Sequence, residues 1–320
     1  MSRASVGAAL SAIALFTVVA ASPAVADDHR GGGDDSSTIT YPLPGTSVFP
    51  EGVDTFGRYF YVTSTATGNV FRGRIHDPHS AELFLPGGQD GRATALGIEA
   101  TDHLLLIAGG PTGTVFVYDR RSGDFVSSHK VPTGTPAVLN DLAVAPNGDV
   151  YVTDSQTDIV YRIDEGDVED STPLRVSTKL ADFDPVGAFN ANGIVSARGG
   201  RYLIVVETDT GRLFRISTRG ASVAPIDLAG ATVTGGDGLE IKDRTLYVVR
   251  GTAGVITKVR LNDSFTSGRV VSETTDPTFR FATTTALDRG RLLVVNSQFD
   301  KQVPGAVPEE PFTVSSIPRP

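Results

Sequence analysis

The sequence predicts an all-β protein, a six-bladed β-propeller that is closed by an N-terminal strand completing the last blade. Two observations carry this prediction. A unit of about 45 residues with up to four short strands recurs six times, and no long stretch of helical periodicity follows the first 26 residues. The 35 glycines and 19 prolines among 320 residues suit short strands joined by tight turns.

Each unit begins with a strand of alternating apolar residues, continues through a polar turn and returns on a more continuous apolar strand. "VLNDLAVAPNGDVYVTDS" and "TGGDGLEIKDRTLYVVRG" are two examples. A third strand such as "DIVYRIDE" follows, and often a less regular fourth. Four antiparallel strands per unit are typical of a propeller blade.

The residues that open the first strand of each unit set the period; they are Glu51, Thr94, Asn140, Asn192, Asp237 and Thr283. Successive anchors lie 43, 46, 52, 45 and 46 residues apart. The sixth unit lacks a fourth strand, which "STITYPLP" near the N-terminus can supply, so that the ring closes without open edges. A β-solenoid and two stacked sandwiches remain as alternatives.

The N-terminal residues read as a targeting segment. "MSR" precedes an apolar run that ends in "AVA", which predicts a signal peptide over residues 1–26, a polar leader over 27–37 and the propeller over 38–320. We therefore expect a secreted, extracellular protein without a membrane segment after cleavage. A membrane anchor is the alternative. The chain has no cysteine and so cannot use disulfides.

The charge excludes some partners. A net charge of −9 argues against nucleic acid and against anionic membranes. A closed propeller needs no second subunit, so we expect a monomer that acts on a small molecule.

The anchors predict a metal site. The first strands of all blades start on one face around the central axis, so two carboxylates and two carboxamides converge there. Hard oxygen ligands select Ca²⁺, with Mg²⁺, Zn²⁺ or Mn²⁺ as alternatives. The glycines beside Asp237 are expected to let its backbone approach the channel. Turn capping is the competing interpretation for Asn140 and Asn192.

These repeats resemble the SMP-30/gluconolactonase/LRE-like family of six-bladed propellers, through "FPEGV", "LNDLAVAPNGDVYVTDS", "NANGIV" and "GGDGLEI". The resemblance covers nearly the whole chain after the signal. It implies one divalent ion, usually Ca²⁺, held by Glu51, Asn192 and Asp237. It also implies that Asn140 reaches the substrate or a water molecule at the metal, and that Asp237 is the catalytic general base.

The resemblance further implies hydrolysis of lactones or related esters, in which the metal polarises the carbonyl group. Two features depart from the family. Val138 stands where sugar-lactone enzymes often carry an arginine two residues before Asn140. The five histidines, expected in exposed loops and turns, provide no pair near the metal; they are His29, His76, His79, His103 and His129.

The ends of the second strands form an outer ring on the same face. From it we expect Glu207, Arg250 and Asn296 to contact the substrate together with Asn140. A structural ion pair between Glu207 and Arg250 is the alternative, and such an exposed pair would add little stability.

The leading interpretation is thus a secreted, calcium-dependent hydrolase of lactones or esters. The main alternative is a non-catalytic extracellular propeller that binds a ligand or a protein and keeps a structural metal. The fold itself is compatible with both. An isomerase or lyase that uses the same metal is a third possibility.

Overall fold

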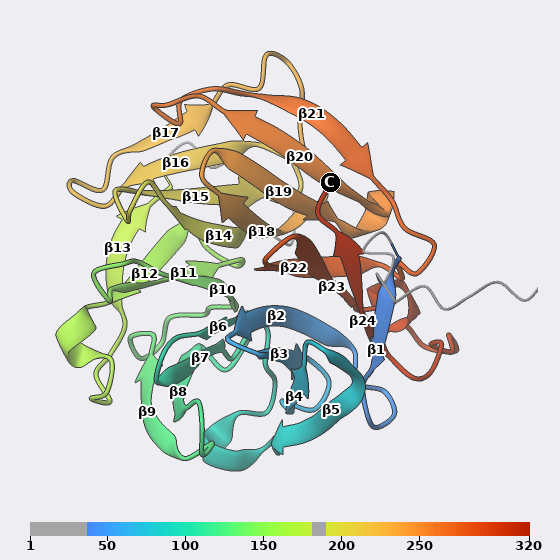
Figure 1. The fold of residues 1–320 in the computed structure, drawn as a ribbon. Coiled ribbons are helices and arrows are strands. Elements are labelled where there is room, and N and C mark those ends of the chain that lie inside the picture. The colour runs from blue at the N-terminus through green and yellow to red at the C-terminus, as the bar shows by residue number, and fades with distance from the viewer. Residues whose placement is uncertain (1–36, 181–189) are drawn as a thin grey trace, which may run out of the picture. The chain divides into compact units, whose positions relative to one another are not determined.

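The computed structural model describes residues 37–180 and 190–320. The predicted signal peptide and all of the predicted leader except Ser37 lie outside the described residues. Within them the chain forms six four-stranded antiparallel sheets arranged around a central axis, which is a six-bladed β-propeller (Figure 1). No helix in the described part of the chain is both long and apolar enough to cross a bilayer.

The first three blades follow the chain from inside to outside. Blade one contains β2 (Pro50–Phe56), β3 (Tyr59–Ser64), β4 (Val70–Arg74) and β5 (Asp77–Leu85). Blade two contains β6 (Ile98–Ala100), β7 (Leu104–Ala108), β8 (Thr114–Asp119) and β9 (Phe125–Lys130). Blade three contains β10 (Leu139–Val144), β11 (Val150–Asp154), β12 (Ile159–Ile163) and β13 (Arg175–Lys179).

The next two blades repeat this order, and the last one joins the two ends of the described chain. Blade four contains β14 (Ala191–Ala197), β15 (Tyr202–Glu207), β16 (Leu213–Ser217) and β17 (Val223–Ile226). Blade five contains β18 (Gly236–Lys242), β19 (Thr245–Arg250), β20 (Val255–Leu261) and β21 (Gly268–Thr274). Blade six contains β22 (Ala282–Asp288), β23 (Arg291–Asn296), β24 (Thr313–Pro318) and β1 (Ile39–Pro42).

The ring closes as the sequence predicts. β1 pairs with β24 along four residues, from Ile39 opposite Ser316 to Pro42 opposite Thr313. Figure 1 shows the blue β1 beside the red β24. The outer edge of blade six is therefore built from the other end of the domain, and β24, the last strand of the chain, gains a paired neighbour.

The hydrophobic core lies between the blades. The buried apolar residues form six clusters, and each cluster joins the facing sides of two neighbouring blades. One cluster joins blades six and one and contains Tyr41 of β1 and Phe60 of β3, whose ring centroids are 4.9 Å apart. Each blade thus buries both of its faces, as the repeat pattern requires.

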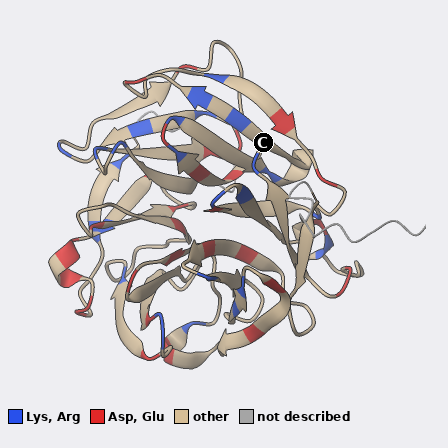
Figure 2. Ribbon diagram, viewed as in Figure 1, with Lys and Arg blue, Asp and Glu red and all other residues tan. Residues whose placement is uncertain are grey.

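The inner strands carry most of the charge that faces the axis. β2, β6, β10, β14, β18 and β22 contain seven acidic residues and one basic residue, Lys242. Acidic residues gather around the centre of the ring in Figure 2. Three of these acids accept backbone hydrogen bonds from the next blade. The bonds are Ala100 N–H to Asp54 (2.7 Å), Ile194 N–H to Asp141 (3.1 Å) and Leu287 N–H to Glu240 (3.1 Å).

We call Asp54, Asp141 and Glu240 the inter-blade carboxylates, because they link blade one to two, three to four and five to six. With Glu99 they line a cavity of about 180 Å³ along the inner strands. Burial raises the pKa of Asp54 to about 6 and that of Glu240 to about 8, which outweighs the lowering by the backbone N–H donors.

These pKa values predict that the fold loses stability as the pH rises. Between its ordinary pKa of 4.5 and the folded value of about 8, Glu240 keeps its proton in the folded protein and releases it on unfolding. The stabilisation is complete below the ordinary pKa and is lost as the pH passes the folded value. We expect the free energy of unfolding, measured in EDTA, to fall by roughly 1–3 kcal/mol from pH 5 to pH 9.

Glu240→Gln provides the matched control, since glutamine keeps the shape of the side chain and does not titrate. Its unfolding free energy should depend less steeply on pH than that of the wild type. A wild-type stability that rises towards pH 9 would contradict the assignment of a protonated Glu240 in the folded protein.

Candidate active site at the mouth of the central channel

Five of the six sequence anchors occupy equivalent places in their blades. Glu51, Asn140, Asn192, Asp237 and Thr283 are each the second residue of an inner strand, and each lies where the pairing with the second strand shifts by a β-bulge. Such bulges re-aim side chains and are common next to active sites. The five side chains therefore start from the same face of the ring.

In blade two the anchor predicted from the sequence is not the residue that occupies the equivalent position. Ile98 pairs with Ile107 as Val53 pairs with Val62 in blade one, so the residue equivalent to Glu51 is Leu96 and not Thr94. The first strand of this blade is short, and no polar residue marks its start. An aliphatic side chain therefore stands at this position of the ring.

The glycines after the anchors have a different role from the predicted one. A Cβ atom on Gly238 would lie 2.7 Å from Cα of Thr284 in blade six, and a Cβ on Gly193 would lie 2.3 Å from the carbonyl oxygen of Asp237. Both glycines are required because the inner strand of the next blade passes this close. They hold Asp237 in place by allowing close packing between blades.

The four polar residues predicted for the site, Glu51, Asn140, Asn192 and Asp237, meet in one cavity of about 560 Å³, a size that suits a small-molecule ligand. Thr283 does not line it, and its buried hydroxyl group is hydrogen-bonded within the protein. Threonine hydroxyl groups and Asp209 add to the polar lining. The apolar lining was not predicted; it comes from Leu96, Pro111, Phe281 and Phe299.

Three oxygen atoms at the cavity are buried without a protein partner. They are Oε2 of Glu51, Oδ1 of Asn140 and Oδ1 of Asn192, and each of these residues is at most 5% exposed. A buried polar atom that lacks a hydrogen bond is costly, and most are satisfied in folded proteins. The arrangement therefore favours a ligand that contacts these oxygens.

Neighbouring hydroxyl groups fix the two asparagines. Ser155 Oγ donates to the carbonyl oxygen of Ala191 (2.7 Å), so it accepts the bond from Nδ2 of Asn140 (2.9 Å). Nδ2 of Asn192 donates to Thr208 Oγ1 (3.1 Å), and the same side chain donates a hydrogen bond to Asp237. In both asparagines the amide nitrogen donates to a protein group and the carbonyl oxygen is left without a protein partner.

The two carboxyl groups of the site destabilise each other as anions. Burial raises the pKa of Glu51 well above its ordinary value, and the charges of Asp237 and Asp141 raise it further. Burial also raises the pKa of Asp237 to about 7, against the lowering effect of the hydrogen bond from Asn192. A cation between the two groups would relieve both the burial cost and the repulsion.

The donor set fits a hard divalent cation. Carboxylate and carboxamide oxygens are the ligands that Ca²⁺ takes, in flexible geometry. Within residues 37–180 and 190–320, no three His, Cys, Asp or Glu side chains gather as a metal-binding group. The candidate site depends instead on two carboxylates complemented by amide oxygens.

The predicted outer-ring residues do not line this cavity. Glu207 pairs with Arg212 (2.8 Å), and Arg250 pairs with Glu273 (2.6 Å), so the considered ion pair between Glu207 and Arg250 is not formed. Asn296 accepts a hydrogen bond from Arg280 N–H and donates to two hydroxyl groups of β24, those of Thr313 and Ser315. All three side chains are held by residues of their own blades, and we assign them structural rather than substrate-binding positions.

The histidines are also placed away from the site. His76, His79 and His103 are exposed, as predicted, and His29 lies outside the described residues. The expectation of exposure was wrong for His129 of β9, which is fully buried and hydrogen-bonded to the Val168 and Thr172 carbonyl groups. None of the described histidines lines the cavity.

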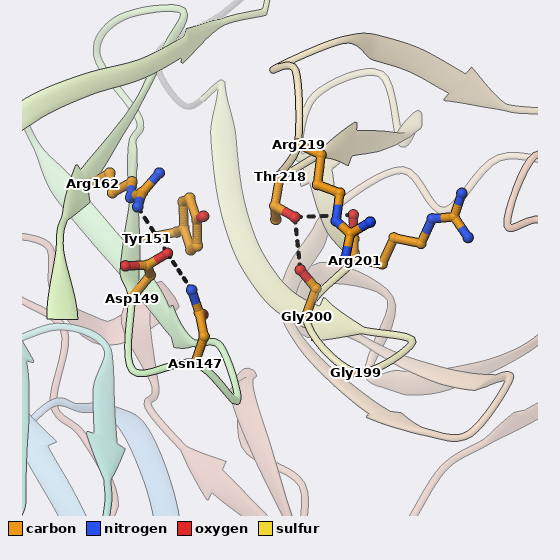
Figure 3. Close-up of a pocket in the computed structure, with 9 residues that line it drawn as sticks. All are labelled: Asn147, Asp149, Tyr151, Arg162, Gly199, Gly200, Arg201, Thr218 and Arg219. Atoms are coloured by element: carbon orange, nitrogen blue, oxygen red, sulfur yellow. Dashed lines mark hydrogen bonds and ion pairs between the residues drawn. The ribbon is translucent and has the colours of Figure 1, made fainter.

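A second cavity, of about 330 Å³, lies between blades three and four (Figure 3). It is lined by the β10–β11 and β14–β15 hairpins, which are at the opposite ends of the inner strands from the anchors. Figure 3 shows Asp149 bonded to Arg162 (2.9 Å) and to Asn147 (2.6 Å). Arg201 and Arg219 at its rim are solvent-exposed, and we assign no function to this cavity.

The comparisons with known proteins support the fold. No family model matches the chain, and no curated protein matches it in sequence. Solved structures match it over most of its length. The major allergen Mala s 1 of Malassezia sympodialis is 14% identical with a TM-score of 0.66, and covers 87% of this chain and 95% of its own.

Two further similar structures have names that state an enzymatic activity or a bound metal. A gluconolactonase from Xanthomonas campestris is 16% identical with a TM-score of 0.64 over 90% of both chains. Regucalcin, a calcium-binding protein from Agrobacterium tumefaciens, is 15% identical with a TM-score of 0.61, over 86% of this chain and 90% of its own. At these identities the likeness shows a shared β-propeller fold.

Proposed function

We propose that this chain is an exported, divalent-cation-dependent hydrolase of lactones or related esters, related to the SMP-30/gluconolactonase/LRE-like proteins. The observation that carries the proposal is the set of unpartnered buried oxygens of Glu51, Asn140 and Asn192, in one cavity with Asp237. The names of the similar gluconolactonase and regucalcin agree with it. The proposal that the protein is exported rests on the signal-peptide pattern of residues 1–26.

In this proposal Glu51, Asn192 and Asp237 hold the cation. When bound, it supplies Lewis acidity for the ester carbonyl group and lowers the pKa of nearby water. Ca²⁺ is the ion we propose first, because two carboxylates and amide oxygens suit it, and Mg²⁺, Zn²⁺ and Mn²⁺ are the alternatives to be compared.

Asp237 acts as the general base. It accepts a proton from the attacking water while the new C–O bond forms, and returns that proton to the alkoxide when the ring C–O bond breaks. The hydrogen bond from Asn192 orients the carboxylate for this transfer. Asn140 presents its free Oδ1 to the substrate, held in place by Ser155.

The test is a panel of aliphatic γ- and δ-lactones, acyl-homoserine lactones and aldonolactones, given to residues 27–320 in Ca²⁺, then after EDTA, and again after Ca²⁺ is restored. We expect turnover of at least one class, its loss on chelation and its recovery. Mass analysis of the product separates hydrolysis, which adds one water, from elimination, which leaves the mass unchanged and would indicate a lyase.

Absence of turnover on every member of the panel, with calcium bound, would contradict the proposal. It would favour the alternative of a ligand- or protein-binding propeller in which the ion is structural.

A further inference from the structure

The cavity wall beside the candidate metal ligands contains a group of apolar side chains that the proposed reaction does not require. Leu96 and Pro111 come from blade two, and Phe281 and Phe299 come from blade six. We call these four residues the apolar wall. Ester hydrolysis needs a cation site, a base and a water molecule, so the wall must serve another purpose, such as selecting the substrate.

Phe281 is placed there against its backbone preference. Its φ is 50°, in the left-handed region that a bulky residue rarely adopts. Its ring packs 6.2 Å from the ring of Phe299. Gly251 of the neighbouring blade makes room for it, since a Cβ atom there would lie 3.0 Å from the ring of Phe281. Three separate features therefore combine to hold one aromatic ring at the cavity.

Leu96 of blade two also indicates that this cavity is built to contact apolar groups. In the other five blades the equivalent residue is Glu, Asn, Asn, Asp or Thr, and in blade two it is an aliphatic side chain. At four of these positions, Glu51, Asn140, Asn192 and Asp237, a polar side chain lines the cavity. Leucine instead extends the apolar surface to the ring of anchors itself.

The described lining of the cavity contains no lysine, arginine or histidine. Its polar side chains away from the anchors include Asp209, Thr252 and Gln302, which are exposed, so the apolar wall itself offers no hydrogen-bonding group to a hydroxylated substrate. Thr94 Oγ1 already donates to the carbonyl oxygen of Thr65, and Thr208 Oγ1 already accepts from Asn192. Hydroxyl groups that lay against the apolar wall would be buried without partners, which would weaken binding.

We infer that the substrate class is a lactone or ester with an apolar alkyl or aryl substituent, and that Phe281, Phe299 and Leu96 select it over polyhydroxylated sugar lactones. This inference rests on the proposed function. The ester group lies at the polar anchors, and the substituent lies against the apolar wall, where its removal from water stabilises the complex.

The test compares two δ-lactones that share the ring and the scissile bond, one with a five-carbon alkyl chain and one that is glucono-δ-lactone. We expect kcat/KM for the alkyl lactone to be about 100-fold higher than that for gluconolactone, since each buried methylene contributes several-fold.

The variant Phe281→Ala should lower kcat/KM for the alkyl lactone by roughly 10-fold, while kcat/KM for gluconolactone changes by less than about 3-fold. Leu96→Asn should shift the ratio in the same direction. Phe125→Ala, on the exposed outer strand of blade two, is the control and should leave the ratio unchanged.

The result that would overturn the inference is equal or faster hydrolysis of gluconolactone, in which case the proposed function still stands. If neither these two lactones nor any other member of the panel is hydrolysed, the proposed function fails, and calorimetric binding of the corresponding alkyl and polyhydroxylated δ-lactams tests the wall itself. Tighter binding of the alkyl lactam that Phe281→Ala weakens supports the inference, and equal binding of both overturns it.

Discussion

Asp237→Asn is expected to lower kcat/KM for lactone hydrolysis by about 10³-fold or more, while the protein stays folded. Asparagine has the same shape but cannot accept the proton from water, and it is a weaker cation ligand. The change also removes the repulsion between the half-buried carboxylate of Asp237 and the carboxyl group of Glu51. Without metal, the variant should therefore be as stable as the wild type or more stable. Steady-state kinetics and thermal unfolding in EDTA measure the two effects.

Asp263→Asn provides the matched control, because it makes the same chemical change at an exposed turn where the carboxylate pairs with Arg244. Its kcat/KM should equal that of the wild type. Wild-type activity in Asp237→Asn would remove Asp237 from the mechanism, and a large loss of stability would instead show that its carboxylate supports the fold.

Tyr41→Ala is expected to cost about 3–5 kcal/mol of unfolding free energy, because it empties a buried position at the closure of the ring. Tyr41 is 1% exposed, packs edge-to-face on Phe60 and donates a hydrogen bond to the carbonyl oxygen of Ile75 in blade one (2.6 Å). A single side chain of β1 thus joins blades six and one. Denaturation in urea measures the change.

Tyr41→Phe separates the two contributions, since it removes only the hydroxyl group and should cost about 1 kcal/mol. A loss below that value for Tyr41→Ala would mean that closure by β1 contributes little to stability, and that the ring is held by the other inter-blade clusters.

The fold could be predicted because each blade repeats the same strand pattern and the register follows from it. Glu51, Asn192 and Asp237 were placed correctly within their strands because a propeller brings the starts of all inner strands to one face. The same logic fails in blade two, where the equivalent residue, Leu96, is apolar and the sequence pattern points instead to the nearby polar residue Thr94. The repeat therefore locates the start of an inner strand only where a polar residue marks it.

Side chains whose partners come from the outer strands could not be predicted in this way. Glu207 and Arg250 occupy equivalent ends of second strands, but their partners are Arg212 and Glu273, which the pattern does not relate to them. Phe281 was missed for a different reason. Its place in the cavity depends on a left-handed backbone conformation and on the glycine opposite, and neither has a signature in a single sequence.

We propose that Glu51, Asn192 and Asp237 hold a divalent cation at the mouth of the channel. A crystal structure of residues 27–320 grown in calcium would show whether they do. We expect one ion in the cavity, at roughly 2.3–2.6 Å from oxygen atoms of Glu51, Asn192 and Asp237. An empty cavity at millimolar calcium, or an ion bound instead among the inter-blade carboxylates, would contradict it.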